Sequence, residues 1–293
     1  MLKKNKSLNH KKSFLFNFLN YFLKHKYTNI VYKLIILFKT NYRNTNTSTE
    51  KQRQMNTIIL FSFFSTFVEN PISTNDKTLV FQGIAKDLVS REMLYREVHS
   101  EIYSEKGHYR TQTNFFGSNN RLIATRNLDF TNSKSRPEYT FHDYRTGSKE
   151  SVTNKNGIFT ITYQENRESP LILKSIEVPE PAVVDGGFNY FVKSEWNRLK
   201  EGKTVVFNFI STARQDYYRF QLSMQANKNN AQNNHVTIIM EPVSYILKAL
   251  LDPVIITYDK NTQRIVNYRG ISNIKDLTGN SYFATLTYPE MGP

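Results

Sequence analysis

Histidine and carboxylate side chains are the first groups in this chain whose types and spacing could do chemistry. Glu97, His99 and Glu101 alternate along one predicted strand and therefore share one of its faces. Such a face could bind a cation, although the polar outer face of any sheet has the same pattern. The other histidines of this region, which show no paired ligand spacing, are His108, His142 and His235. We therefore predict no metal site and interpret the histidines as exposed or hydrogen-bonded structural residues.

Sequence motifs of catalysis are absent from the chain. Its 293 residues include no cysteine, which excludes disulfides, a thiol nucleophile and Cys-ligated zinc. There is no G-x-S-x-G elbow, and Asp185-Gly186-Gly187 lacks the pattern and the lysine of a phosphate-binding loop. We predict no catalytic residues and no cofactor, and an enzyme is the weakest of our functional hypotheses.

A ligand-binding site is predicted from one aromatic helix and two arginines. Phe188, Phe191 and Trp196 fall near helical spacing, so they form a wide apolar face that should pack on a sheet. If their strands pair, Arg219 and Arg269 could present guanidinium groups at one rim, where they would suit a carboxylate or a phosphate. The alternative is that acidic neighbours pair with these arginines over aromatic surface.

Short alternating segments separated by Gly, Asn, Asp and Ser clusters dominate the chain after Leu79 and predict β-strands. The named strands are 94–103, 122–130, 157–163, 204–210, 217–224, 236–240, 254–258, 264–268 and 281–288. In 94–103 the apolar residues lie opposite Glu97, His99 and Glu101, which predicts a half-buried strand. In 122–130 the apolar face is interrupted by Arg126. Helices are predicted at 188–199 and 243–251.

Consecutive strands joined by short turns predict an α+β, mainly β fold. We expect a curved antiparallel meander, or open half-barrel, with one or two helices packed on its concave face. The hairpin YDKNTQRIVNY at 258–268 resembles those of the bacterial lipoprotein-carrier (LolA/LolB-like) half-barrels, and the architectural resemblance covers 79–288. The resemblance implies a periplasmic fold that encloses an apolar cavity for acyl chains, and it assigns no specific binding residues.

The net charge of +14 suggests nucleic-acid binding until its distribution is considered. Residues 1–54 hold twelve basic side chains and the single acid Glu50, so this segment carries +11 and the rest of the chain only +3. The remainder lacks the basic stripe of a nucleic-acid-binding surface. We expect no nucleic-acid partner.

An uncharged apolar segment begins at Met55 and ends before Glu69. Its length suits the apolar region of a signal peptide better than a membrane span, but no A-x-A cleavage pattern follows it. We predict three parts: a basic, partly disordered or amphipathic extension at 1–54, a signal peptide or membrane anchor at 55–75, and a single β-rich domain at 76–293. The protein would be periplasmic or secreted, or else anchored to the inner membrane by 55–68.

The sequence leaves three functions open. The first is a non-enzymatic bacterial cell-envelope protein that binds a lipid or another apolar ligand in a half-barrel cavity. The second is an envelope interaction or scaffold protein that recognises another protein through sheet edges or aromatic rims. The third is an enzyme with no recognisable motif, which would require a cleft where a histidine meets carboxylates of shifted pKa.

Overall fold

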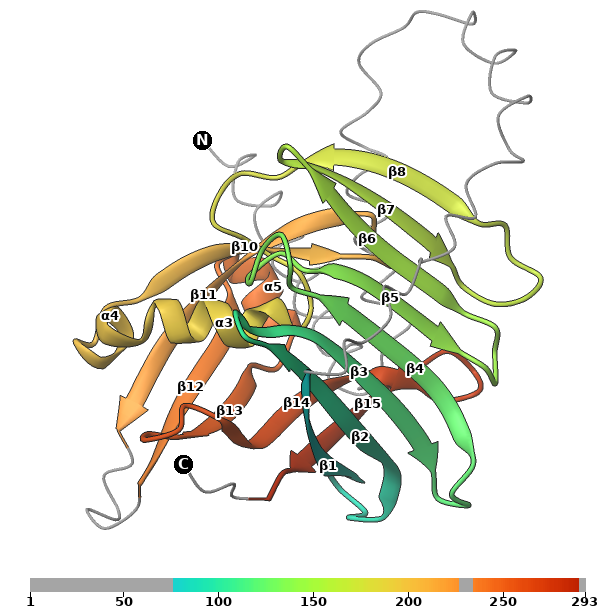
Figure 1. Ribbon diagram of the computed structural model, residues 1–293, viewed down its shortest axis with the longest axis horizontal. Helices are drawn as coiled ribbons and strands as arrows, with labels where there is room; N and C mark the ends of the chain where they lie inside the picture. Colours follow the sequence, from blue (N-terminus) through green and yellow to red (C-terminus); the bar gives the residue numbers. More distant parts are fainter. Residues whose placement is uncertain (1–75, 227–233, 290–293) are drawn as a thin grey trace, which may run out of the picture. The chain divides into compact units, whose positions relative to one another are not determined.

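The computed structural model describes residues 76–226 and 234–289, which form one fifteen-stranded sheet (Figure 1). The predictions for 1–54 and for the segment that begins at Met55 lie outside the described residues. The first eight strands are Lys77–Asp87 (β1), Met93–Ser104 (β2), Gly107–Gly117 (β3), Leu122–Asp129 (β4), Glu138–Asp143 (β5), Lys149–Lys155 (β6), Ile158–Gln164 (β7) and Ile172–Glu177 (β8). The remaining strands are Ala182–Val183 (β9), Val205–Ser211 (β10), Asp216–Ala226 (β11), His235–Pro242 (β12), Val254–Asp259 (β13), Ile265–Lys275 (β14) and Ser281–Thr287 (β15).

The strand order follows the chain outward from the middle of the sheet and then inward from the opposite edge. From β1 to β8 each strand pairs with the next, and from β10 to β15 the same holds. Antiparallel pairing of β1 with β15 joins the two halves, whereas β9 pairs with β10 in parallel. The two edges of the sheet, β8 and β9, are consecutive in sequence, so that residues 178–181 alone connect them.

Contacts between side chains and backbone also link β8 and the connection that follows it to β10 and the turn after β10. Lys174 of β8 donates to the carbonyl oxygen of Gln215 at 2.9 Å, and the Gln215 amide donates to the carbonyl oxygen of Ile172 at 3.1 Å. Gln215 lies in the turn between β10 and β11. The Asn208 amide in β10 donates to the carbonyl oxygen of Pro179 at 2.6 Å. These contacts fix the position of β8 against the second half of the sheet.

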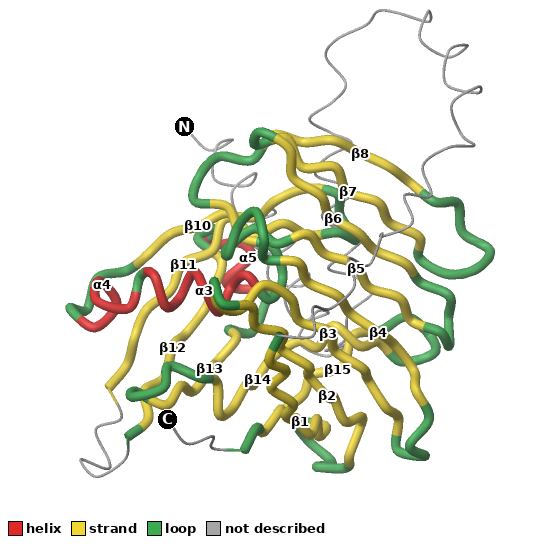
Figure 2. The backbone as a smooth tube through the Cα atoms, viewed as in Figure 1, coloured by secondary structure: helices red, strands yellow, loops and turns green. Residues whose placement is uncertain are grey.

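Three short helices occur in the described part of the chain, and strands dominate it (Figure 2). They are Gly187–Ser194 (α3), Trp196–Lys200 (α4) and Tyr245–Leu250 (α5). The predicted helix at 188–199 is thus interrupted at Glu195, next to Ser194, whose hydroxyl donates to the carbonyl oxygen of Phe191 at 2.8 Å. The helix predicted at 243–251 is confirmed as α5, which begins after the side-chain cap of Ser244.

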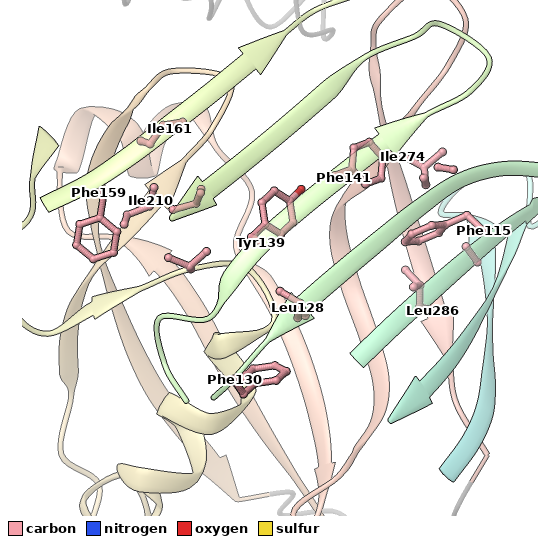
Figure 3. Packing of buried hydrophobic residues seen from close by; sticks show 14 of the residues in the cluster. Phe115, Leu128, Phe130, Tyr139, Phe141, Phe159, Ile161, Ile210, Ile274 and Leu286 are labelled. Atoms are coloured by element: carbon pink, nitrogen blue, oxygen red, sulfur yellow. The ribbon is translucent and has the colours of Figure 1, made fainter. Parts of the chain in front are cut away.

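Two clusters of apolar side chains form the core. Aromatic and aliphatic residues from both halves of the sheet build the first cluster, in which Phe115 of β3, Leu128 of β4, Phe141 of β5, Ile161 of β7 and Ile210 of β10 are all buried (Figure 3). The second cluster packs the apolar residues of α3 and α4 on β10 to β13, with Phe207 and Ile238 fully buried. The prediction of a mainly β fold is therefore confirmed as one large, mostly antiparallel, open sheet.

Candidate functional site

A cavity of about 510 Å³ lies between α3 and the inner strands of the sheet. Its lining comes from β1 to β4, from β10 to β15, from α3 and from the segment after α5. The apolar part of the lining includes Phe115, Leu128, Phe209, Phe220 and Met240. A cavity of this size with apolar and aromatic walls and a few convergent polar groups is typical of small-molecule binding sites.

Strand β2 supplies an unusual share of the polar lining. Side chains alternate between faces along a strand, so Tyr95, Glu97, His99, Glu101 and Tyr103 all line the cavity. Glu97 and His99 are only 4% and 7% exposed. The expectation that the apolar residues of 94–103 form its buried face holds for Ile102, which is 5% exposed, but is wrong for Leu94 and Val98, which are only half-buried. The polar face is turned to the interior.

Two of these β2 residues belong to a group of interior polar side chains that we call the Glu97 cluster. Its five members are Glu97, His99, Thr113, Arg126 and Asp185. The Nε2 atom of His99 lies 2.8 Å from Oε1 of Glu97, and its Nδ1 atom lies 3.1 Å from the Thr113 hydroxyl. Arg126 donates through NH2 to that hydroxyl at 3.3 Å and through NH1 to Asp185 Oδ1 at 3.0 Å. A chain of polar contacts thus runs from Asp185 to Glu97.

Two further side chains complete the hydrogen bonding of this cluster. The Tyr288 hydroxyl donates to Glu97 Oε1, and the Asn273 amide donates to Asp185 Oδ2 at 3.0 Å. Tyr288 approaches closely because Gly83 lies beside it: a Cβ atom at Gly83 would lie 2.5 Å from Cε1 of the tyrosine ring. The carboxylates of Glu97 and Asp185 are therefore both paired.

The electrostatics of the Glu97 cluster favour the charged forms of Glu97 and Arg126. Burial alone would raise the pKa of Glu97, but His99, Arg126 and the Tyr288 hydroxyl outweigh it and hold the pKa below its ordinary value. Burial likewise opposes the charge on Arg126, and the carboxylates of Asp185 and Glu97 raise its pKa instead. The ion pair is thus maintained in an environment of low solvent access.

The order Thr113, His99, Glu97 has the connectivity of a hydroxyl nucleophile, a base and an orienting acid. The Thr113 side chain is fully buried, at 0% exposure, and does not line the cavity. Its hydroxyl also accepts from Arg126. In this arrangement the threonine holds polar groups together and presents no nucleophile to a bound molecule.

A second group, the Lys193 cluster, consists of Glu101, Tyr103, His108, Tyr190, Lys193 and Arg264. Arg264 donates to Glu101 Oε2 at 3.1 Å, and the Tyr103 hydroxyl donates to the same oxygen at 2.7 Å. The Arg264 guanidinium also stacks on Phe81, with its central carbon 4.9 Å from the ring centroid. All six residues line the cavity.

Histidine and lysine side chains form the other half of the Lys193 cluster. His108 contacts the Tyr190 hydroxyl at 2.6 Å through Nδ1 and the Thr111 hydroxyl at 2.8 Å through Nε2. The Lys193 ammonium lies 6.0 Å from the centroid of the Tyr190 ring. Across the described ranges, no hydrogen bond or ion pair is made by this ammonium.

Positive charge is in excess around the Lys193 cluster. Burial, followed by the charge of Arg264, lowers the pKa of Lys193 despite the opposing effect of Glu101. Burial also lowers the pKa of His108, where Lys134 and Arg264 oppose Glu101. Burial raises the pKa of Tyr190 to about 12. One carboxylate therefore faces three cationic side chains in this part of the molecule.

The structure separates the five residues predicted to bind a ligand. Phe188 lines the cavity, whereas Phe191 is buried in the second core cluster and Trp196 packs edge-on against Tyr258. Arg219 and Arg269 are exposed on β11 and β14, which do not pair because β12 and β13 lie between them. Their neighbours Phe220 and Tyr268 line the cavity, so the two arginines belong to the other face of the sheet.

Arg126 and Lys193 are among the cavity residues that our sequence prediction of the site missed. Arg126 did leave a signal, since it interrupts the apolar face of its strand between Ala124 and Leu128, both of which are buried. Lys193 left none, because a lysine on a helix is ordinarily solvated. Among the described residues, no group of three or more His, Asp or Glu side chains is placed to hold a metal ion.

Comparisons with known proteins complete the description of the site. No family model, no curated protein and no solved structure matches the chain. Of the helices described in the structure, none has the length and apolar character needed to cross a membrane. The assignment of function therefore depends on the cavity and its lining.

Proposed function

We propose that this chain is a non-enzymatic bacterial cell-envelope protein that holds a lipid or another apolar ligand in the cavity of a curved half-barrel. The observation that carries the proposal is the cavity of about 510 Å³, whose apolar walls come from both halves of the sheet. An architecture similar to that of the lipoprotein carriers is part of the proposal. So is an exported location, with 55–68 as signal peptide or anchor.

The connection between β8 and β9 supports a strongly curved sheet. Fifteen strands laid flat at ~4.8 Å spacing would be about 67 Å wide. Residues 178–181 can bridge only about 18 Å when fully extended. The two edges must therefore approach each other. The hydrogen bonds between β8 and Gln215, in the turn after β10, fit such a curvature. A sheet curved in this way would place α3 and the cavity on its concave face.

The chemistry of the lining supports an apolar occupant. Phe209, Phe220 and Met240 line the cavity on one side, and Phe115 and Leu128 line it on the other. An apolar ligand that fills such a space removes apolar surface from water, which stabilises the complex by about 25 cal/mol per Å². Nearly all polar groups of the Glu97 cluster already have partners within the protein, so they do not need hydrogen bonds from water in the cavity.

A pair of adjacent residues on β12 allows a direct test. Met240 lines the cavity, whereas Ile239 next to it lies on the opposite face and is partly exposed. We expect Met240→Trp to fill the cavity and to reduce the lipid that co-purifies with the protein, as measured by native mass spectrometry after detergent-free purification. Ile239→Trp is the matched control and should retain it. A wild-type protein that carries no lipid and binds none on addition would refute the proposal.

One observation favours protein recognition as a second candidate function. The edge strand β8 and the residue before it expose Leu171, Ile172 and Leu173 at 54%, 49% and 62%. An exposed apolar edge strand is a template for pairing with another chain. Ile172→Lys should abolish capture of a cross-linked envelope partner and leave lipid binding intact if this candidate holds.

A further inference from the structure

The Lys193 cluster differs from an ordinary polar lining because its cationic donors are not used up within the protein. The Lys193 ammonium makes no hydrogen bond or ion pair with the described residues, and it is not among the buried, unpaired atoms of the described chain. It is therefore accessible from the cavity that Lys193 and Arg264 both line. The Arg264 guanidinium donates to Glu101 Oε2 and also lies within hydrogen-bonding reach of the Tyr103 hydroxyl.

Charge complementarity points to the kind of group that would sit there. Lys193, Arg264 and Lys134 bring three positive charges to this region against the single carboxylate of Glu101. Lys134 lies over the Tyr190 ring at 5.6 Å and donates to the carbonyl oxygen of His108. An anion bound between Lys193 and Arg264 would accept charge-assisted hydrogen bonds from both, with the guanidinium suited to a carboxylate or phosphate.

The Glu97 cluster does not compete for the same group. Glu97 and Asp185 flank the Arg126 guanidinium, so its charge is already balanced within the protein. The only guanidinium nitrogen of Arg126 without a hydrogen-bond partner in the described chain, Nε, is buried. A negatively charged ligand is therefore attracted to the Lys193 cluster and finds no unbalanced cation in the Glu97 cluster, which sets its orientation.

From this geometry we infer that the ligand is a single-chain amphiphile with an anionic end group, held by Lys193 and Arg264 while its apolar chain occupies the cavity. The inference rests on the proposed function, because it needs the apolar cavity to bind the chain. It adds the chemical class of the ligand and its direction. A carboxylate and a phosphate monoester share the chemistry that these two cations recognise.

The test uses four probes that share one alkyl chain and differ only at the head: palmitate, hexadecyl phosphate, hexadecanol and hexadecyltrimethylammonium. We expect isothermal titration below the critical micelle concentrations to show palmitate or hexadecyl phosphate binding about tenfold tighter than hexadecanol. The stronger of the two anions identifies the head group. The trimethylammonium probe should bind most weakly.

Lys193→Met is the diagnostic variant, because Lys193 has no ion partner in the described chain whose loss could disturb the fold. It should bring the ratio of anion to alcohol affinity close to one. Lys200→Met, at an exposed lysine outside the cavity, is the matched control and should keep the wild-type ratio. Hexadecanol that binds the wild type as tightly as both anionic probes, or an unchanged ratio in Lys193→Met, would overturn the anionic head and leave the apolar cavity standing. Failure of every probe to bind would overturn the proposed function as well.

Discussion

The Glu97 cluster and the Lys193 cluster both contribute to the lining of the same cavity. They differ in how many of their polar groups have hydrogen-bond or ion partners within the protein. In the Glu97 cluster each carboxylate is paired with a cation or a histidine, and Tyr288 and Asn273 fill further positions. In the Lys193 cluster one carboxylate serves Arg264 and Tyr103, while the Lys193 ammonium has no ion partner within the described ranges. The first cluster is closed on itself, and the second has donors to spare.

This difference separates a stabilising network from a recognition site. A closed, buried network costs free energy to open, since removal of one partner leaves an uncompensated charge in a medium of low dielectric constant. Spare donors beside an apolar cavity cost little to alter and are available to a ligand. Substitutions in the Glu97 cluster should therefore change stability most, and substitutions in the Lys193 cluster should change binding most.

Loss of Arg126 should give the largest effect on stability. Its guanidinium is the only cation between Asp185 and Glu97 that is always charged, and the side chains of the Arg126–Asp185 pair are each 14% exposed. We expect Arg126→Met to lower the free energy of unfolding by about 3 to 5 kcal/mol, because it leaves buried carboxylates without their partner. Urea denaturation followed by circular dichroism measures the change.

Arg264→Met is the matched control for the second cluster. Without Arg264, Glu101 still accepts a hydrogen bond from the Tyr103 hydroxyl. The Arg264–Glu101 ion pair is also more exposed than the Arg126–Asp185 ion pair. The loss should be about 1 kcal/mol or less, as for partly exposed ion pairs. Equal losses in the two variants would remove the distinction between the closed network and the open one.

Substitution of Gly83 should give the second largest loss of stability, because this glycine leaves the space that the Tyr288 ring occupies beside Glu97. We expect Gly83→Ala to destabilise the fold by about 1 to 3 kcal/mol through overpacking, measured again by urea denaturation. In a Tyr288→Ala background the same substitution should cost much less, because the clash is gone. The same cost in both backgrounds would show that the ring is not held by this contact.

The sequence prediction located nine of the fifteen described strands, missed β1, β3, β5, β6, β8 and β9, and did not specify the strand order. Alternation in segments such as Leu122–Asp129 and Val254–Asp259 located β4 and β13 within a few residues. Pairing of β1 with β15 joins segments about two hundred residues apart, and no local pattern specifies such a partner. β9 is two residues long and gives no periodic signal. The edge strand β8 is largely exposed on both faces, so it shows no alternation.

The candidate site was harder to predict than the fold. The sequence correctly placed Glu97, His99 and Glu101 on one strand face, but a polar face that lines a cavity has the same pattern as one that faces solvent. Arg219 and Arg269 looked suitable because their guanidinium groups would meet at one rim if their strands paired. Only the strand order shows that two strands separate them. Burial, which distinguishes an interior charge from a surface charge, depends on contacts from α3 and β14 that are remote in sequence.

Glu97 should make the stability of the fold sensitive to acid. Because the folded state holds the pKa of Glu97 below its ordinary value of 4.5, its ionised form contributes stability that is fully present above that pH. This contribution is lost as the pH falls below 4.5 through the folded-state pKa. Glu97→Gln should therefore flatten the fall in unfolding free energy below pH 4.5, measured by urea titrations at several pH values. Glu92→Gln, at an exposed carboxylate, controls for loss of charge alone, and an equal flattening there would contradict the assignment.

The smallest effect concerns His108 and reports on the Lys193 cluster without a mutation. Burial and the charges of Lys134 and Arg264 lower the pKa of His108 in the free protein, against Glu101. An anion between Lys193 and Arg264 would offset this positive charge, so palmitate should raise the pKa of His108 and hexadecanol should not. By linkage, palmitate affinity should then increase modestly as the pH falls below 6.5. An NMR titration of the imidazole signals measures both pKa values, with His142 outside the cavity as the internal reference. A His108 pKa that palmitate leaves unchanged would mean that the anionic group lies elsewhere in the cavity, since a charge bound within the Lys193 cluster must act on a histidine that belongs to it.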